Sequence, residues 1–305
     1  MQTHPPIYQQ LSTLRDYIRW GVSQFNKAQL YYGHGTDNAL DDALRLVLHT
    51  VGIDLDAYTE LLSAVLTEQE RLEVLDAIQT RVDERVPVPY LTGEAWFAGL
   101  PFTVDRRVLI PRSPIAELIE QGFSPWLTDQ TVTSILDLCT GSGCIGIACA
   151  HYFDEAKVDL SDVSNDAIAV AKLNIERHEV NDRVHAVQSD LFESLQGRQY
   201  QLIVSNPPYV DHEDLHSMPA EYQHEPAVAL GSGEQGLDIT RQILKTANDY
   251  LTDNGLLVVE VGNSGIALEN AYPDVAFTWV EFERGGHGVF VFSKAELDYY
   301  APFFT

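Results

Sequence analysis

The sequence has few positive charges for its size. It contains 19 Lys and Arg residues against 45 Asp and Glu, which gives a formal net charge of −26. Proteins that bind nucleic acid need a cationic surface for the phosphates, so this composition argues against nucleic acid as the main partner. A strongly acidic chain suits a basic partner, or it simply keeps the protein soluble.

Cysteine is scarce, and long apolar runs are missing. The three cysteines are Cys139, Cys144 and Cys149, and their spacing does not match the Cys-x-x-Cys pattern of zinc or redox sites. We therefore expect small buried side chains in a reducing compartment and no metal site. No basic and apolar signal segment opens the chain, and no run is long enough to span a bilayer. These features predict a soluble cytoplasmic protein without a membrane partner.

Residues 1–89 have the apolar spacing of helices and are expected to form a first domain. One helix is expected to begin with a capping box at Thr67 and Glu70. Its predicted buried stripe is Leu72, Leu75, Ile78 and Val82.

The remaining chain has a different pattern. Prolines at 87 and 89 end the last helix, and residues 90–112 read as a linking β-hairpin around Gly99. From 113 to 305, apolar strands alternate with helical segments, which predicts an α/β domain with a mostly parallel sheet and helices on both faces.

A G-x-G-x-x-G pattern begins at Gly141, between an expected strand and an expected helix. Gly141 and Gly143 lack Cβ atoms, so a ligand can approach the backbone beside the helix N-terminus. Asp162 follows about 20 residues later, at the end of the next strand, where a carboxylate binds ribose hydroxyls or, alternatively, caps a helix. Asp137, with no Arg or Lys nearby, favours a cationic sulfonium ligand over the pyrophosphate of a nicotinamide dinucleotide.

The sequence Asn206-Pro207-Pro208-Tyr209 follows an apolar run, 200–204, that is expected to be a strand. Ligands of open α/β sheets bind at the carboxyl ends of the strands. An ordinary turn is the alternative, and the glycine loop upstream favours a site. The Asn206 side-chain oxygen and the Pro207 carbonyl can accept the two N–H groups of a carboxamide, while Tyr209 offers a flat face to pack on it.

These motifs resemble those of the class I, Rossmann-like methyltransferases of the HemK type, and the resemblance covers essentially the whole chain. Members of this family use S-adenosyl-L-methionine to methylate the side-chain amide nitrogen of a protein glutamine. The resemblance implies a small N-terminal helical domain for substrate recognition, a linking hairpin and a catalytic domain. It also implies the catalytic residues Asn206, Pro207 and Tyr209, and cofactor contacts from Asp137, Cys139, Thr140, Gly141, Gly143, Asp162, Asp190, Leu191 and Asn206.

Three further segments are similar to the PrmB branch of the family: Arg112-Ser113-Pro114-Ile115, residues 32–38 and residues 221–226. The substrate of that branch is a glutamine of the large-subunit ribosomal protein L-three, a basic protein that suits an acidic enzyme. The substrate contacts so implied are Arg112, Asn206, Pro207, Pro208 and Tyr209.

Arg112 is expected either to anchor a loop or substrate or to form a surface salt bridge. The release-factor branch continues Pro-Arg with Pro-Glu/Asp-Thr-Glu and often has an aromatic residue where this chain has Leu191. Alternatives to the ribosomal substrate are a release factor and, less favoured by the charge, the exocyclic amine of adenine in nucleic acid. A nicotinamide oxidoreductase and a non-catalytic binding module are further alternatives.

Overall fold

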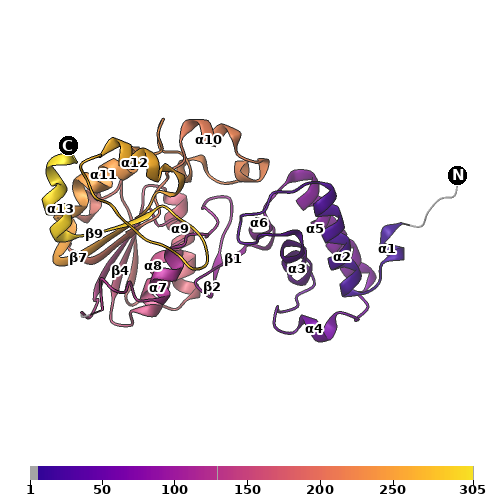
Figure 1. The fold of residues 1–305 in the computed structure, drawn as a ribbon. Helices are drawn as coiled ribbons and strands as arrows, with labels where there is room; N and C mark the ends of the chain where they lie inside the picture. The colour runs from indigo at the N-terminus through magenta and orange to yellow at the C-terminus, as the bar shows by residue number, and fades with distance from the viewer. Residues whose placement is uncertain (1–5, 129, 305) are drawn as a thin grey trace. The chain divides into compact units, whose positions relative to one another are not determined.

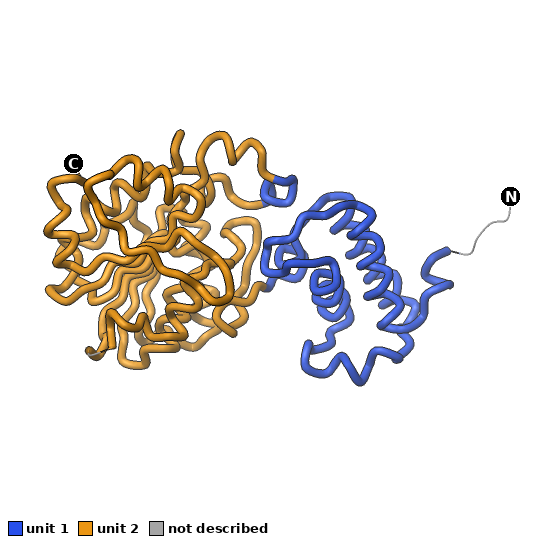
Figure 2. Tube along the Cα trace, in the orientation of Figure 1, with its two compact units in different colours: residues 1–94, 219–224 blue, residues 95–218, 225–305 orange. Residues whose placement is uncertain are grey.

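A computed structural model describes residues 6–128 and 130–304. The chain forms two compact units, of which the first comprises Met1–Glu94 and Pro219–His224 and the second comprises Ala95–Met218 and Glu225–Thr305 (Figure 2). The first unit thus ends a few residues beyond the predicted boundary at residue 89, and the chain returns to it once. None of the helices in the described residues is long and apolar enough to cross a membrane.

The first unit is helical (Figure 1). Its core is formed by three amphipathic helices, which bury residues such as Leu14, Phe25, Val47 and Ile78 against one another. The helices of this unit are α1 (Ile7–Gln10), α2 (Leu14–Lys27), α3 (Ala39–Thr50), α4 (Tyr58–Leu61), α5 (Glu68–Glu84) and α6 (Val88–Thr92).

Helix α5 begins as predicted, because Thr67 and Glu70 form a reciprocal capping box. Its buried face differs from the prediction, since Leu72 is 45% exposed while Val74, Ile78 and Arg81 are buried. The sequence pattern was misleading here because an arginine takes the third position of the buried stripe. Arg81 is accommodated in the interior by an ion pair with Asp42, in which Nη2 lies 3.0 Å from Oδ2.

Residues 219–224 join the first unit through Glu221. This carboxylate accepts hydrogen bonds from the Tyr31 backbone N–H and from Arg85 Nη1, both at 2.9 Å. The Tyr222 ring lies against His34, with 4.4 Å between the ring centroids. Residues 32–38, one of the segments similar to the family branch, are therefore in contact within this unit with residues 221–224 of another.

The second unit contains a seven-stranded sheet with the order β5-β4-β3-β6-β7-β9-β8. Strands β3 to β7 are parallel, as predicted, and β9 is antiparallel to both of its neighbours. A separate two-stranded sheet of β1 and β2 forms the predicted hairpin. The strands are β1 (Glu94–Phe97), β2 (Leu100–Thr103), β3 (Ser134–Leu138), β4 (Lys157–Asp162), β5 (Val184–Gln188), β6 (Tyr200–Ser205), β7 (Leu251–Glu260), β8 (Thr278–Trp279) and β9 (Val289–Ser293).

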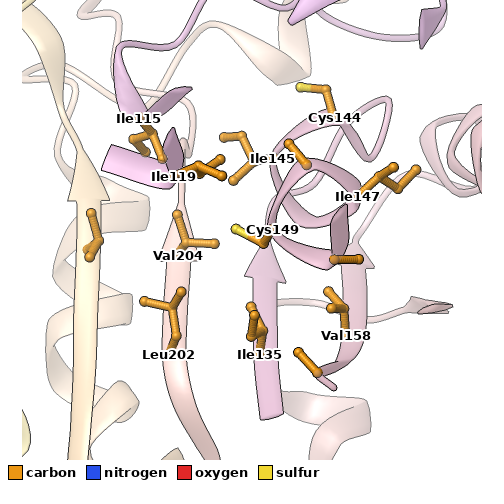
Figure 3. Close-up of a cluster of buried hydrophobic side chains, with 14 of the residues drawn as sticks. Ile115, Ile119, Ile135, Cys144, Ile145, Ile147, Cys149, Val158, Leu202 and Val204 are labelled. Carbon is orange, nitrogen blue, oxygen red and sulfur yellow. The ribbon is translucent and has the colours of Figure 1, made fainter. Parts of the chain in front are cut away.

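Both faces of this sheet are covered by helices. On one face Ile135, Val158 and Val204 pack against the apolar side of α8, which carries the buried Cys144 and Cys149, as predicted for these two cysteines (Figure 3). Cys139 was also expected to be buried, but it is only partly buried because it follows β3 at the edge of a cavity. The other face has its own core. The helices are α7 (Ile115–Glu120), α8 (Cys144–Tyr152) and α9 (Asn165–Arg177) on the first face, α11 (Asp238–Thr246), α12 (Gly265–Ala271) and α13 (Lys294–Tyr300) on the second, and α10 (His212–Ser217) outside both cores.

Candidate active site

A cavity of the second unit lies at the carboxyl ends of the parallel strands. Strand order reverses at β3, whose neighbours β4 and β6 lie on opposite sides, and such a switch point opens a crevice for ligands. The lining residues come from loops after β3, β4, β5 and β6 and from two more distant segments. They are Arg107–Leu109, Pro111–Ser113, Leu138–Ser142, Cys144, Ile145, Ser161–Ser164, Ala167, Ser189–Leu191, Asn206, Pro208, Pro226, Val228, Ala229, Gly231 and Ile239.

Asp137 supports the glycine loop from beneath. It is fully buried, and its Oδ2 accepts hydrogen bonds from Thr140 Oγ1 at 2.5 Å and from the Gly146 N–H at 2.8 Å. Burial raises the pKa of Asp137 to about 7. The structure therefore places this predicted cofactor contact below the loop, whereas its neighbours Cys139 and Thr140 line the cavity.

The two predicted ligand-approach glycines have different surroundings. A Cβ on Gly141 would meet no atom within 4 Å, and Gly141 lines the cavity. A Cβ on Gly143 would lie 3.0 Å from Leu160 Cδ1 and 3.2 Å from Ile147 Cδ1. Gly141 thus leaves room for a ligand, while Gly143 allows the loop to pack on the sheet.

These surroundings predict different effects for two alanine substitutions. Gly143→Ala is expected to destabilise folding by about 1–3 kcal/mol, because the methyl group overpacks the core at a positive φ. Gly141→Ala is expected to cost about 1 kcal/mol of backbone strain and to weaken nucleoside binding, since its methyl group points into open space. Thermal unfolding and calorimetric titration with S-adenosylmethionine measure the two effects. Equal stability losses in both variants would contradict this assignment.

Asp162 lines the cavity and also braces the glycine loop. Its Oδ2 accepts the Gly141 N–H at 3.0 Å and its Oδ1 accepts the Ser164 N–H at 2.9 Å. Burial raises the pKa of Asp162, and these backbone donors act in the opposite direction. Asp162 is not the N-cap of α9. That position is taken by Ser164, whose hydroxyl accepts the Ala167 N–H. Each Asp162 oxygen retains capacity to accept a further donor from a ligand.

Two aliphatic side chains and one acid line the cavity beyond Asp162. They are Val163, Leu191 and the exposed Asp190. Leu191 has a positive φ of 45°, so the chain turns sharply after β5 and brings this side chain to the cavity.

The Asn206–Tyr209 loop is only partly in the cavity. Asn206 and Pro208 line it, and Pro207 is buried. Tyr209 lies behind the loop, where its Oη donates a hydrogen bond to Glu260 Oε1 at 2.9 Å and its carbonyl accepts one from Ser264 Oγ at 2.7 Å. The structure therefore brings Asn206 together with Gly141, as predicted from the strand ends, and assigns the Tyr209 hydroxyl an anchoring contact.

Arg112 lines the cavity and is held by Glu225. Its Nη1 and Nη2 donate to the two Glu225 oxygens at 2.6 and 2.8 Å, and Glu225 Oε1 also accepts the Ile110 N–H. Such a two-pronged pair fixes geometry as well as charge. Neither Glu225 nor Glu260 was predicted as a site residue. The sequence signals for Glu260 are an acid at the end of a long apolar strand and its place in Glu260-Val261-Gly262, a segment that also resembles the family.

Comparison with known proteins identifies the family. A family model described as "Methyltransferase small domain" matches residues 123–223. The chain is 48% identical over 304 residues to a "Ribosomal protein uL3 glutamine methyltransferase" of Francisella tularensis, covering 99% of this chain and 97% of the relative. It is 49% identical to a protein of the same name from Neisseria gonorrhoeae, covering 95% and 97%.

Solved structures are more distant. The hMettl16 catalytic domain is 15% identical with a TM-score of 0.49, covering 79% of this chain and 86% of that one, and this likeness adds nothing to the assignment. The two relatives decide it, because they match nearly the full chain. The protein belongs to the HemK-type protein glutamine methyltransferases, in the branch of the uL3 enzymes, and its second unit is a class I, Rossmann-like methyltransferase domain.

Proposed function

We propose that this protein is a cytoplasmic enzyme that uses S-adenosyl-L-methionine to methylate the side-chain amide nitrogen of a glutamine in the large-subunit ribosomal protein uL3. The observation that carries the proposal is one cavity that joins the groups suited to a nucleoside, Gly141 and Asp162, with Asn206, whose side-chain oxygen can accept an amide N–H. The names of the two relatives support the choice of substrate.

The residues of the cavity fit this cofactor. Open space beside Gly141 admits the ligand, and the Asp162 carboxylate can accept ribose hydroxyls. Val163 and Leu191 offer aliphatic surface to an adenine ring, in place of the aromatic residue of the release-factor branch. When bound, the cofactor supplies an electrophilic methyl group on a sulfonium.

A carboxamide nitrogen is a weak nucleophile, so the enzyme must orient it. Asn206 Oδ1 and the Pro207 carbonyl accept its two N–H groups and turn the nitrogen toward the methyl group. The same acceptors stabilise the positive charge that develops on nitrogen. Pro207 contributes a carbonyl without a competing N–H, and the adjacent prolines stiffen the loop. The proton that the methyl group replaces is released to solvent.

The acidic surface suits a basic ribosomal protein better than a nucleic acid. With a net charge of −26, the enzyme attracts cationic partners and repels phosphates. The first unit, with residues 219–224, is the proposed docking element for the protein substrate. Its role in recognition follows from the family resemblance and from its separate fold.

Labelled cofactor tests the proposed activity directly. The enzyme is incubated with unmodified uL3, with a release factor and with DNA in separate reactions, and the labelled residue is mapped by mass spectrometry. We expect label on one glutamine side chain of uL3. Label confined to the release factor or to DNA would overturn the substrate assignment, and preferential binding of NADH would overturn the cofactor assignment.

Electrostatic steering predicts salt sensitivity. Raising the salt concentration from about 0.05 to 0.5 M shortens the screening length severalfold and is expected to lower kcat/KM on uL3 by about tenfold or more. A short, near-neutral peptide containing the same glutamine serves as the control and is expected to respond little. An unchanged kcat/KM on the full protein would count against steering.

A further inference from the structure

Glu260 is a buried acid beside the amide-binding loop for which the proposed chemistry has no direct use. It is 4% exposed and ends β7, which runs parallel to β6 with Val259 paired to Ser205. The end of β7 therefore lies next to the start of the Asn206 loop. Its Oε1 accepts the Tyr209 hydroxyl at 2.9 Å, and its Oε2 accepts the Ser113 hydroxyl at 2.5 Å.

Contacts on several sides hold Tyr209. Its ring lies so close to Gly262 that a Cβ there would come within 2.6 Å of the ring, and Gly262 has a positive φ of 46°. Its carbonyl accepts the Ser264 hydroxyl at 2.7 Å. The two prolines between Asn206 and Tyr209 restrict the backbone, so fixing Tyr209 also restricts where Asn206 can lie.

The second donor to Glu260 belongs to another wall of the cavity. Ser113 lines the cavity, and its hydroxyl accepts the Ile115 N–H at 3.1 Å while donating to Glu260. The preceding Arg112 is paired with Glu225. One carboxylate therefore joins the Asn206 loop to the Arg112–Ser113 segment.

The Glu260 carboxylate suits this task chemically. Both oxygens accept a hydroxyl donor, which favours the ionised form, and such charge-assisted bonds are short and strong. Burial raises the pKa of Glu260, whereas the Ser113 and Tyr209 donors and the nearby Arg112 guanidinium lower it. A glutamine at this position has only one acceptor oxygen. It could keep both contacts only if one of the two hydroxyls accepted a hydrogen bond from the glutamine NH2 group instead of donating one.

We propose that Glu260 is a positioning residue for methyl transfer, which sets the amide acceptors of Asn206 and Pro207 by holding Tyr209 and Ser113. It acts through Tyr209 and touches neither substrate nor cofactor. The inference rests on the proposed function of the Asn206 loop. It predicts that loss of the Glu260 carboxylate lowers kcat while cofactor affinity is largely kept, because the proposed nucleoside contacts lie on the loops after β3, β4 and β5.

A double-mutant cycle tests the proposal. Glu260→Gln, Tyr209→Phe and the double variant are compared for kcat on uL3, for cofactor Kd and for melting temperature. Each single variant is expected to lose about 10- to 100-fold in kcat, the effect of a slightly misplaced reacting group, with cofactor Kd changed by less than about threefold. The double variant is expected to lose about as much kcat as the more impaired single variant, because both substitutions disturb the same bond.

Glu117→Gln is the matched control. Glu117 is also buried in the second unit, at 7% exposure, and its carboxylate accepts the Glu283 and Arg284 backbone N–H groups. This variant is expected to lose stability and to keep kcat. If Glu260→Gln fails to fold, Ser113→Ala replaces it in the cycle with Tyr209→Phe, with a smaller kcat loss and the same lack of additivity expected.

Two results would overturn the inference: a folded Glu260→Gln variant with unchanged kcat, or losses that multiply in the double variant. Failure of the proposed function has a different signature, because the unaltered enzyme would then leave uL3 unlabelled.

Discussion

Replacing Asn206 with alanine is expected to lower kcat on uL3 by about 100- to 1000-fold, the usual loss when one preorganised hydrogen-bonding group is removed from a reacting centre. Asn206 lines the cavity directly after β6, and in the proposed mechanism its side-chain oxygen is the acceptor for the substrate amide. Without it, the Pro207 carbonyl alone orients the nitrogen. Single-turnover methylation with labelled cofactor measures the loss.

Cofactor binding separates this effect from a general disturbance of the site. The proposed nucleoside contacts are the glycine loop, Asp162, Val163 and Leu191, so cofactor Kd in Asn206→Ala is expected to change by less than about threefold. Asn248→Ala is the control, because that amide lies in the same unit and bonds Asp298 near the surface. Unchanged turnover in a folded Asn206→Ala variant would refute the role assigned to Asn206.

Replacing Arg81 with methionine is expected to destabilise the first unit by about 3–5 kcal/mol, the usual cost of removing one partner of a buried ion pair. Arg81 is 1% exposed and donates to Asp42 through Nε at 3.2 Å and Nη2 at 3.0 Å. Its Nη1 lies 3.7 Å from Glu221 Oε1. Methionine fills much of the volume but leaves the buried Asp42 charge without its ion-pair partner, whereas Glu221 keeps its pairing with Arg85.

Hydrogen exchange localises the Arg81→Met effect. Protection is expected to fall in α2, α3 and α5 and in residues 219–224, which Glu221 attaches to this unit, while the central strands of the second unit keep theirs. Arg15→Met is the control, since Arg15 is an exposed residue of α2 and its loss is expected to cost less than about 0.5 kcal/mol. Equal stability of the two variants would show that the buried pair contributes little.

Much of the fold was predictable because its signals are local. The Thr67 capping box needs only residues three apart, and the alternation of apolar strands and helices reflects burial on both faces of a parallel sheet. The insertion of β9 between β7 and β8 was not predictable, because pairing of strands distant in sequence depends on the whole sheet. The exposure of Leu72 was missed for a related reason: Arg81 becomes an interior residue only when α3 presents Asp42 to it.

The candidate site likewise combines residues that the sequence predicted with residues that only the folded chain brings together. Gly141, Asp162 and Asn206 were predicted because each follows an apolar strand, and parallel strands end at one edge of the sheet. Pro226, Val228, Ala229 and Gly231 were missed as cavity residues, since the chain reaches the cavity there only after passing through the first unit. The contact of Tyr222 with His34 likewise joins two segments almost 200 residues apart, a distance about which local patterns say nothing.

By itself, the scarcity of cations argued against nucleic acid as the main partner, and the spacing of the three cysteines did not match the common zinc patterns, because charge and ligand spacing are properties of composition and order. The motifs likewise indicated the family, and with it the chemistry that we propose for the Asn206 loop. Only the tertiary structure decided which motif residues face the cavity and which hold it: Gly141 faces it, Asp137 and Gly143 lie beneath it, and Tyr209 is tied to Glu260. The physical reason is that burial and hydrogen-bond partners depend on segments far apart in the chain, so a residue type and its spacing cannot specify them.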